Sequence, residues 1–108
     1  MGHHVLVSLY GVAFNLLNDI DAMQEAFEAA VRICGATVLN RFAHKFTPQG
    51  VTIVYALAES HISIHTFPER GSAAIDVYTC GDMDSMKGMM HLVEYFNPED
   101  YTVQDIKR

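Results

Sequence analysis

Short turns separate four β-strand-like segments in the middle of this chain, and their spacing constrains the fold more than any other feature. The turns include Thr-Pro-Gln-Gly at 47–50 and Pro-Glu-Arg-Gly at 68–71, whose proline and glycine favour chain reversal. Connections this short join antiparallel neighbours, because parallel strands need a crossover of about a dozen residues or more. The pattern therefore predicts an antiparallel sheet with strands at 36–46, 51–58, 61–66 and 73–80.

Two more strands are expected near the ends of the chain. Residues 4–10 alternate, with Val5, Val7 and Leu9 on one face, which is the pattern of a half-buried strand. Residues 101–106 are expected to form the last strand. The whole chain, residues 1–108, is therefore predicted to be one domain, and its length is close to the commonest domain size.

Apolar residues recur at helical spacing in two segments that capping residues bound. Asn18 or Asp19 can cap the first helix, which Gly35 ends, and Asp82 or Asp84 can cap the second. The two apolar stripes are Ile20, Met23, Phe27, Val31 and Cys34, and then Met86, Met90, Val93 and Phe96. Two helices on one face of an antiparallel sheet give a two-layer α/β sandwich of the α+β class.

The face of the sheet away from the helices is expected to be semi-polar. Strand alternation assigns His44, Thr52 and His65 to it. A face of this kind needs a substrate or another subunit to cover it. We therefore predict a homodimer with each active site near the interface.

Charge and cysteine content exclude several classes of partner. A formal net charge of −6 disfavours nucleic acid, which requires a basic surface. No apolar run approaches the ~20 residues of a membrane span, and the N-terminus lacks the layout of a signal peptide. The two cysteines, Cys34 and Cys80, are far apart in the sequence, so reduced thiols and a cytoplasmic location are expected. Cys34 belongs to an apolar stripe and is interpreted as a core residue.

Ser60 follows Glu59 at the end of a predicted strand, and this pair has two interpretations. The ordinary one is a serine at a strand–turn boundary. The alternative is a hydroxyl that attacks the carbonyl of its own preceding residue, which needs an oxyanion donor and a base. Strand parity suggests that Thr52 shares a face with Ser60 and donates to the intermediate. His65 is the nearby group suited to proton transfer near neutral pH.

A metal site and a hydrolase are the other chemical possibilities for these residues. His61 and His65 would lie roughly 13 Å apart along a strand, which is too far to chelate one ion. A serine or cysteine hydrolase needs an orienting partner and an oxyanion pocket, and neither is identifiable. No metal site is therefore expected. Phe46 and Phe67 are core aromatics on periodicity alone, although two facing rings could also enclose a flat heterocycle.

One stretch of the chain closely resembles the processing site of the prokaryotic S-adenosylmethionine decarboxylases. It reads Glu-Ser-His-Ile-Ser-Ile-His-Thr from position 59, then Pro-Glu at 68, Ala-Ala-Ile-Asp at 73 and Thr-Cys-Gly at 79. The likeness continues outside this stretch, at Gly-His-His from position 2 and Cys-Gly-Ala-Thr from position 34. The resemblance implies an α/β sandwich that dimerises, with an active site near the dimer interface.

The same resemblance implies a role for each site residue. Self-cleavage between Glu59 and Ser60 would turn the serine into a pyruvoyl group and divide the chain into 1–59 and 60–108. His65 would be the processing base, helped by Thr52, where family members commonly carry serine. Cys80 would donate the proton in decarboxylation. The substrate-binding residues would be Phe46 and Phe67, which stack on adenine, and Glu69.

The implied reaction is loss of CO₂ from an amino-acid substrate bound to the pyruvoyl carbonyl as a Schiff base. The group acts as an electron sink, and the product would supply the aminopropyl unit for polyamine synthesis. S-adenosylmethionine is the expected substrate. Ornithine and arginine remain alternatives, because some relatives use them and because Glu69 and Asp76 could hold a distal cation. An unprocessed homologue that only binds a small molecule is the other alternative.

Overall fold

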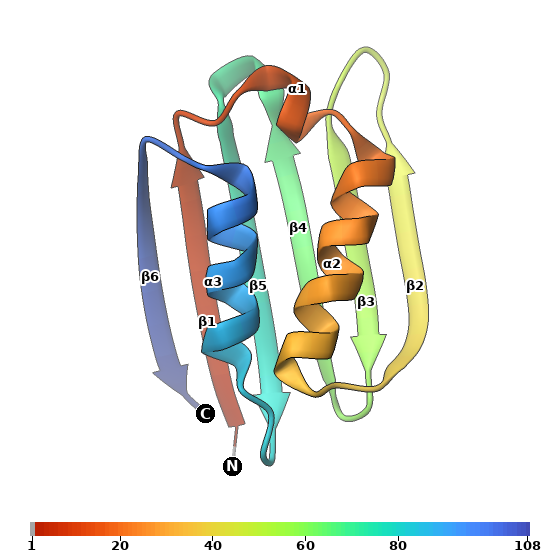
Figure 1. Ribbon diagram of the computed structural model, residues 1–108, viewed down its shortest axis with the longest axis vertical. Coiled ribbons are helices and arrows are strands. Elements are labelled where there is room, and N and C mark those ends of the chain that lie inside the picture. Colours follow the sequence, from red (N-terminus) through yellow and green to blue (C-terminus); the bar gives the residue numbers. More distant parts are fainter. Residues whose placement is uncertain (1) are drawn as a thin grey trace.

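The computed structural model describes residues 2–108, in which six strands form one antiparallel sheet (Figure 1). The strands are β1 (Gly2–Tyr10), β2 (Val38–Lys45), β3 (Val51–Leu57), β4 (Ser60–Phe67), β5 (Ser72–Cys80) and β6 (Asp100–Lys107). Their order in the sheet is β2-β3-β4-β5-β1-β6, so β2 to β5 form a meander and β1 lies between β5 and β6. The predicted antiparallel α+β sandwich is confirmed.

The two long helices, α2 (Ile20–Cys34) and α3 (Ser85–Phe96), lie side by side on one face of the sheet (Figure 1). Of the alternative caps, Asp19 accepts a hydrogen bond from the backbone N–H of Ala22, and Asp84 accepts one from Lys87. Such caps satisfy N–H groups that have no partner within the helix. Gly35 ends α2 in the left-handed conformation, with φ of 76°.

The expected stripe of α3 is only partly confirmed. Val93 and Phe96 are buried as expected, but Met86 and Met90 are only half-buried, and Met89 and Leu92 are fully buried in their place. The reason is Gly88, which faces α2: a Cβ at this position would contact the Cys34 sulfur and lie 2.8 Å from the Ala30 carbonyl oxygen. The absent side chain lets the helices approach closely. The stripe of α2 is mostly confirmed, with Met23, Phe27, Val31 and Cys34 all buried.

Two short helical elements were not predicted. Helix α1 (Phe14–Leu17) follows β1, and the 3-10 helix η1 (Pro68–Arg70) occupies the segment expected to be a turn between β4 and β5. Thr66 joins this end of the sheet to α1, because its buried hydroxyl donates to the Leu17 carbonyl and accepts from the Val51 N–H.

The core lies between the helices and the inner face of the sheet, and the other face of the sheet carries no helix (Figure 1). We call this second face the open face. It is semi-polar, as expected, but it also exposes Phe42, Phe46 and Ile106. Among residues 2–108, the helices fall short of the length and apolar content that crossing a bilayer demands.

Candidate active site

The Glu59–Ser60 bond lies in the tight turn between β3 and β4, at the lower end of the sheet in Figure 1. Leu57 pairs with Ser60, so that Ala58 and Glu59 alone form the loop. Glu59 has φ of 61°, a left-handed conformation. For a non-glycine residue this conformation costs roughly 1–2 kcal/mol, because Cβ crowds the backbone. The carbonyl that the self-cleavage hypothesis makes electrophilic thus belongs to a strained residue.

Cys80 lies beside this turn. It is the last residue of β5, and its backbone N–H donates to the Ser60 hydroxyl oxygen at 3.3 Å. The thiol is free and partly exposed. The structure therefore brings Glu59, Ser60 and Cys80 together, and we call these three residues the cleavage end.

Thr52 does not share a face with Ser60, and that expectation was wrong. In the two-residue hairpin Leu57 pairs with Ser60, and so Thr52 pairs with His65. Even-numbered residues of β3 therefore share a face with odd-numbered residues of β4. Ser60 has the parity of buried Ile62, whereas Thr52 and His65 lie on the open face. The Thr52 hydroxyl and His65 Nδ1 are hydrogen-bonded at 3.0 Å.

The two phenylalanines lie near this Thr52–His65 pair, at the upper end of the sheet. The Phe46 N–H donates to the Gly50 carbonyl at 2.8 Å, and a Cβ on Gly50 would lie 3.9 Å from the Phe46 ring. Phe67 ends β4 two residues after His65, on the same face of the sheet. The His44 ring lies edge-on to Phe46 at 4.6 Å, and the Arg70 guanidinium covers one face of Phe67 at 4.6 Å.

Glu69 is exposed in η1, directly after Phe67 and Pro68. It therefore belongs to the same end of the molecule as the two rings and His65. We call Phe46, Thr52, His65 and Phe67, together with Glu69, the histidine end. Within one chain the two ends are separated by five strand steps from Ser60 to His65, or roughly 16 Å at 3.3 Å per residue. His65 of a chain cannot contact Ser60 of the same chain.

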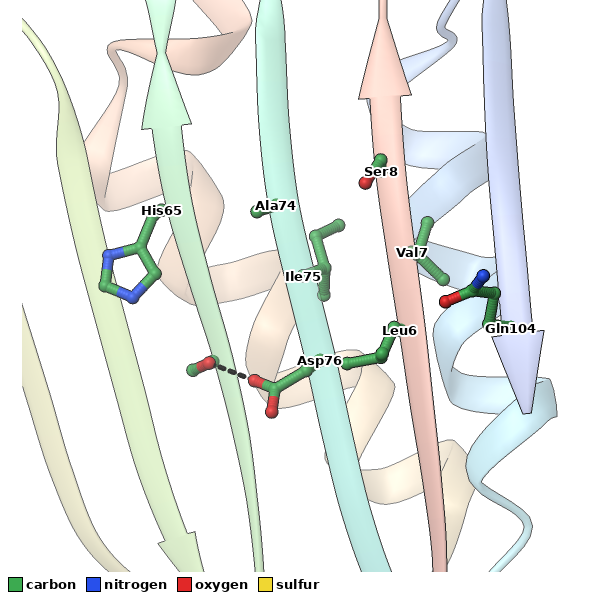
Figure 2. A pocket seen from close by; sticks show the side chains of 9 residues that line it. Leu6, Val7, Ser8, His65, Ala74, Ile75, Asp76 and Gln104 are labelled. Atoms are coloured by element: carbon green, nitrogen blue, oxygen red, sulfur yellow. Dashed lines mark hydrogen bonds between the residues drawn. The ribbon is translucent and has the colours of Figure 1, made fainter. Parts of the chain in front are cut away.

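A cavity of about 510 Å³ opens on the open face between the two ends (Figure 2). His65, Ser63 and Asp76 line one side of it, and Leu6 and Ser8 of β1 line the other, with Gln104 of β6 beyond. A volume of this size is within the range of small-molecule sites. The open face thus offers a hollow surface with polar groups, in the region where a substrate or a subunit is expected.

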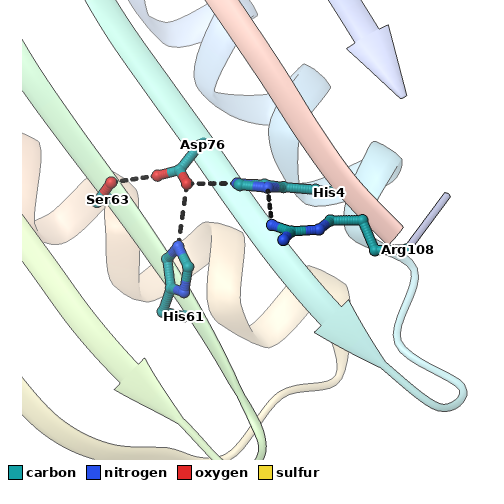
Figure 3. Close-up of polar contacts among 5 residues, drawn as sticks. All are labelled: His4, His61, Ser63, Asp76 and Arg108. Atoms are coloured by element: carbon teal, nitrogen blue, oxygen red, sulfur yellow. Dashed lines mark hydrogen bonds and ion pairs between the residues drawn. The ribbon is translucent and has the colours of Figure 1, made fainter. Parts of the chain in front are cut away.

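Asp76 is the centre of a hydrogen-bond cluster that the sequence analysis missed (Figure 3). Oδ2 accepts from His4 Nε2 at 2.7 Å and from His61 Nε2 at 3.0 Å, while the Ser63 hydroxyl donates to Oδ1. Burial by itself raises the pKa of Asp76, but the three hydrogen bonds outweigh burial and hold the pKa below its ordinary value of 3.8. Strand register joins these residues, since His61 pairs with Tyr78 and Tyr78 with His4.

The ligand atoms of His4, His61 and Asp76 lie within 4.8 Å of one another, which is a spacing at which three groups can hold a metal ion. Arg108 makes this use unfavourable. Its guanidinium can only donate, and it contacts His4 Nδ1 at 3.3 Å. Nδ1 is then the acceptor and Nε2 carries the hydrogen that binds Asp76, whereas a metal would need Nε2 without a hydrogen. The cluster is therefore better described as a hydrogen-bond network.

The sequence of this chain is similar to a known protein family along its length. The family model for S-adenosylmethionine decarboxylase matches residues 3–108. A protein from Brevibacillus brevis, described as an S-adenosylmethionine decarboxylase proenzyme, is 48% identical over 91% of this chain and 74% of its own length. One of the same description from Methanococcus maripaludis is 45% identical over 100% of this chain and 89% of its own.

A solved structure agrees. The crystal structure of the adenosylmethionine decarboxylase from Aquifex aeolicus superposes with a TM-score of 0.92 and 38% identity, covering 100% of this chain and 90% of that one. Similarity in sequence and in fold thus extends over the same full length, including both ends of the open face. The chain belongs to the S-adenosylmethionine decarboxylase family.

Proposed function

We propose that this chain is a proenzyme that cleaves itself between Glu59 and Ser60 and then decarboxylates S-adenosylmethionine. The observation that carries the proposal is the position of the Glu-Ser bond. In a chain that matches the family from residue 3 to residue 108, this bond lies in a two-residue turn with Glu59 in a strained conformation. Cleavage would release this strain, because a chain end is free to leave the left-handed region.

Self-cleavage begins when the Ser60 hydroxyl attacks the Glu59 carbonyl carbon and the peptide C–N bond is exchanged for an ester. A base then removes the Ser60 α-proton, and elimination breaks the Cβ–O bond, leaving Glu59 as a carboxylate. Water converts the remaining dehydroalanine into a pyruvoyl group and ammonia. Once formed, this group supplies an electrophilic carbonyl that takes up the substrate amine and accepts the electrons that remain when CO₂ leaves.

The base is proposed to come from a second protomer. His65 and Thr52 are paired with one another but lie far from Ser60 of their own chain. If two open faces pack with a two-fold axis across the strands, the cleavage end of each protomer meets the histidine end of the other. A two-fold interface creates both contacts at once and so gives two equal sites. The exposed Phe42 and Ile106 on this face support such a homodimer.

Cys80 is the proposed proton donor to the substrate α-carbon after CO₂ has left. Its place beside Ser60 supports this role, since both belong to the cleavage end. Cys80→Ala should still cleave itself but should turn over slowly and inactivate through protonation at the wrong carbon. A Cys80→Ala enzyme with wild-type turnover would contradict the assignment. The free thiols of Cys34 and Cys80 also support a reducing, cytoplasmic setting.

The proposed substrate site uses Phe46 and Phe67 as stacking faces for adenine, with Glu69 close to the bound molecule. Such stacking is worth roughly 0.5–1.5 kcal/mol per aromatic pair beyond burial. Ornithine or arginine would need a free carboxylate for the distal cation. Asp76 is less suited to this than the sequence suggests, because three side chains already occupy its oxygens. Of the two candidate carboxylates, Glu69 alone then stays free for a distal cation, which weakens the case for ornithine or arginine.

The decisive experiment measures CO₂ release from carboxyl-labelled S-adenosylmethionine, ornithine and arginine with one preparation. The same preparation is examined by denaturing mass spectrometry, with Ser60→Ala as the uncleaved control. We expect two chains, 1–59 and 60–108, the second with a blocked start, and release from S-adenosylmethionine alone. Phe46→Ala should then lower kcat/KM strongly. An intact wild-type chain after long incubation would leave a non-catalytic binding protein as the better description.

A further inference from the structure

Tyr78 is held over the open face from several sides, although none of the roles described so far involves it. It lies on β5, two residues before Cys80 and on the same face of the sheet. The His61 ring stacks on it at 6.2 Å, and the His4 ring meets it edge-on at 5.7 Å. The Arg108 guanidinium lies over the ring at 5.8 Å. A cavity of about 590 Å³ is lined by these four side chains.

The partners of Tyr78 are themselves fixed. His4 and His61 both donate to the Asp76 carboxylate, and Arg108 donates to His4, as Figure 3 shows. The position of the Tyr78 ring is therefore set by the same network that the carboxylate organises. A ring constrained in this way presents its hydroxyl in one direction.

The hydroxyl of Tyr78 points to the cleavage end. Gly2 pairs with Cys80 in the β1–β5 register, and a Cβ on Gly2 would lie 2.5 Å from the Tyr78 hydroxyl oxygen and 2.7 Å from its Cζ. The missing side chain at position 2 thus makes the space that the phenol occupies beside Cys80. The neighbouring Cys80 side chain raises the pKa of Tyr78 above its ordinary value, which is the effect expected when the phenol hydroxyl donates to the sulfur.

We propose that Tyr78 is a positioning residue for Cys80: its hydroxyl donates a hydrogen bond to the Cys80 sulfur and so directs the thiol at the substrate α-carbon. The proposal rests on the proposed function. In the step concerned, the electron pair left by CO₂ takes the proton from the Cys80 S–H, and a C–H bond forms at the α-carbon. The sulfur becomes a thiolate that the Tyr78 O–H stabilises until solvent returns the proton.

Loss of this hydrogen bond should affect where the proton is delivered more than whether substrate binds. A thiol that is free to rotate leaves more time for solvent to protonate the pyruvoyl-derived carbon. Hydrolysis by water then releases an aldehyde, and the substrate nitrogen stays on the protein as an N-terminal alanine. The count of turnovers per inactivation, the partition ratio, therefore reports the role of Tyr78 directly.

The test compares Tyr78→Phe with wild type and with Tyr101→Phe, a control at an exposed tyrosine of β6. Each variant is first checked by mass spectrometry for cleavage at Ser60. For Tyr78→Phe we expect KM close to wild type and a partition ratio about tenfold lower, as loss of one hydrogen bond implies. N-terminal sequencing should detect alanine at the start of the second chain after turnover. Tyr101→Phe should match wild type.

Gly2→Ala provides a second variant that keeps the hydroxyl but displaces the phenol, and we expect it to lower the partition ratio as Tyr78→Phe does. The proposed role of Tyr78 is wrong if the Tyr78→Phe enzyme is cleaved and active and keeps the wild-type partition ratio, while Cys80→Ala has a lower partition ratio. A Gly2→Ala enzyme indistinguishable from wild type would equally overturn it. A wild-type chain that neither cleaves nor releases CO₂ would instead refute the proposed function.

Discussion

Co-expression of His65→Ala with Ser60→Ala tests whether one active site is built from two protomers. Each variant alone should remain uncleaved, since the first lacks the proposed base and the second lacks the hydroxyl. In a mixed dimer, the intact Ser60 of the first chain meets the intact His65 of the second. This expectation rests on distance. Ser60 and His65 of one chain lie roughly 16 Å apart along β4, whereas a hydrogen bond needs about 3 Å.

The size of the effect follows from the pairing statistics. With equal expression and random association, about half of the His65→Ala chains enter mixed dimers, and so about half should be cleaved. Each mixed dimer has one intact site and one site with both defects. Decarboxylation by the mixture should therefore reach about one quarter of the wild-type value per protomer.

Denaturing mass spectrometry resolves the two variants by mass, and light scattering establishes the oligomeric state. A matched control replaces the second variant with the Ser60→Ala/His65→Ala double variant, which offers no intact histidine and should restore no cleavage. Uncleaved His65→Ala chains in a verified mixed dimer would refute the two-protomer site. Cleavage of His65→Ala by itself would show that His65 is not the processing base.

Three further predictions concern the fold. Gly88→Ala should lower the free energy of unfolding by about 1–3 kcal/mol in urea denaturation, because its Cβ would lie 2.8 Å from the Ala30 carbonyl oxygen; an unchanged midpoint would contradict the close helix contact. The hydrogen bonds that hold the pKa of Asp76 below 3.8 give stability that is present above this value and lost as the pH falls through the folded pKa. Asp76→Asn should therefore show a shallower loss of stability below pH 3.8 than wild type does, and equal slopes would argue against the network. In the uncleavable background, Glu59→Gly should raise the unfolding free energy by roughly 0.5–1 kcal/mol through relief of left-handed strain, whereas Ala58→Gly, at a neighbouring position without positive φ, should not.

Local patterns in the sequence were sufficient to predict the secondary structure and the class of fold. Alternation predicts strands, and the short turns allow only antiparallel neighbours, so the central meander follows from positions 36 to 80. Capping residues were harder to choose, because Asn18 and Asp19 are both suitable and only the chain path selects Asp19. The inward face of α3 was predicted correctly at Val93 and Phe96 but wrongly in the first half of the helix, because Gly88, which carries no apolar side chain, lies at the contact with α2.

The residues of the proposed site were also visible in the sequence, but their arrangement was not. The resemblance singles out Ser60, His65 and Cys80 by motif, and a motif contains no information on distance. Whether Thr52 faces Ser60 depends on hairpin register, which a single residue of loop length inverts. The Asp76 cluster also depends on register, since His4 and Asp76 are far apart in sequence and lie on adjacent strands.

By itself, the sequence determined that this chain forms an antiparallel α+β sandwich and carries a Glu-Ser bond in a turn, because both depend on contacts between near neighbours. Only the tertiary structure decided that Ser60 and Cys80 lie together while Thr52 and His65 lie five strand steps away. It also decided that Gly2 makes room for Tyr78 beside Cys80. The physical reason is that strand pairing joins distant segments, and the side chains that meet across them are set by register rather than by local preference.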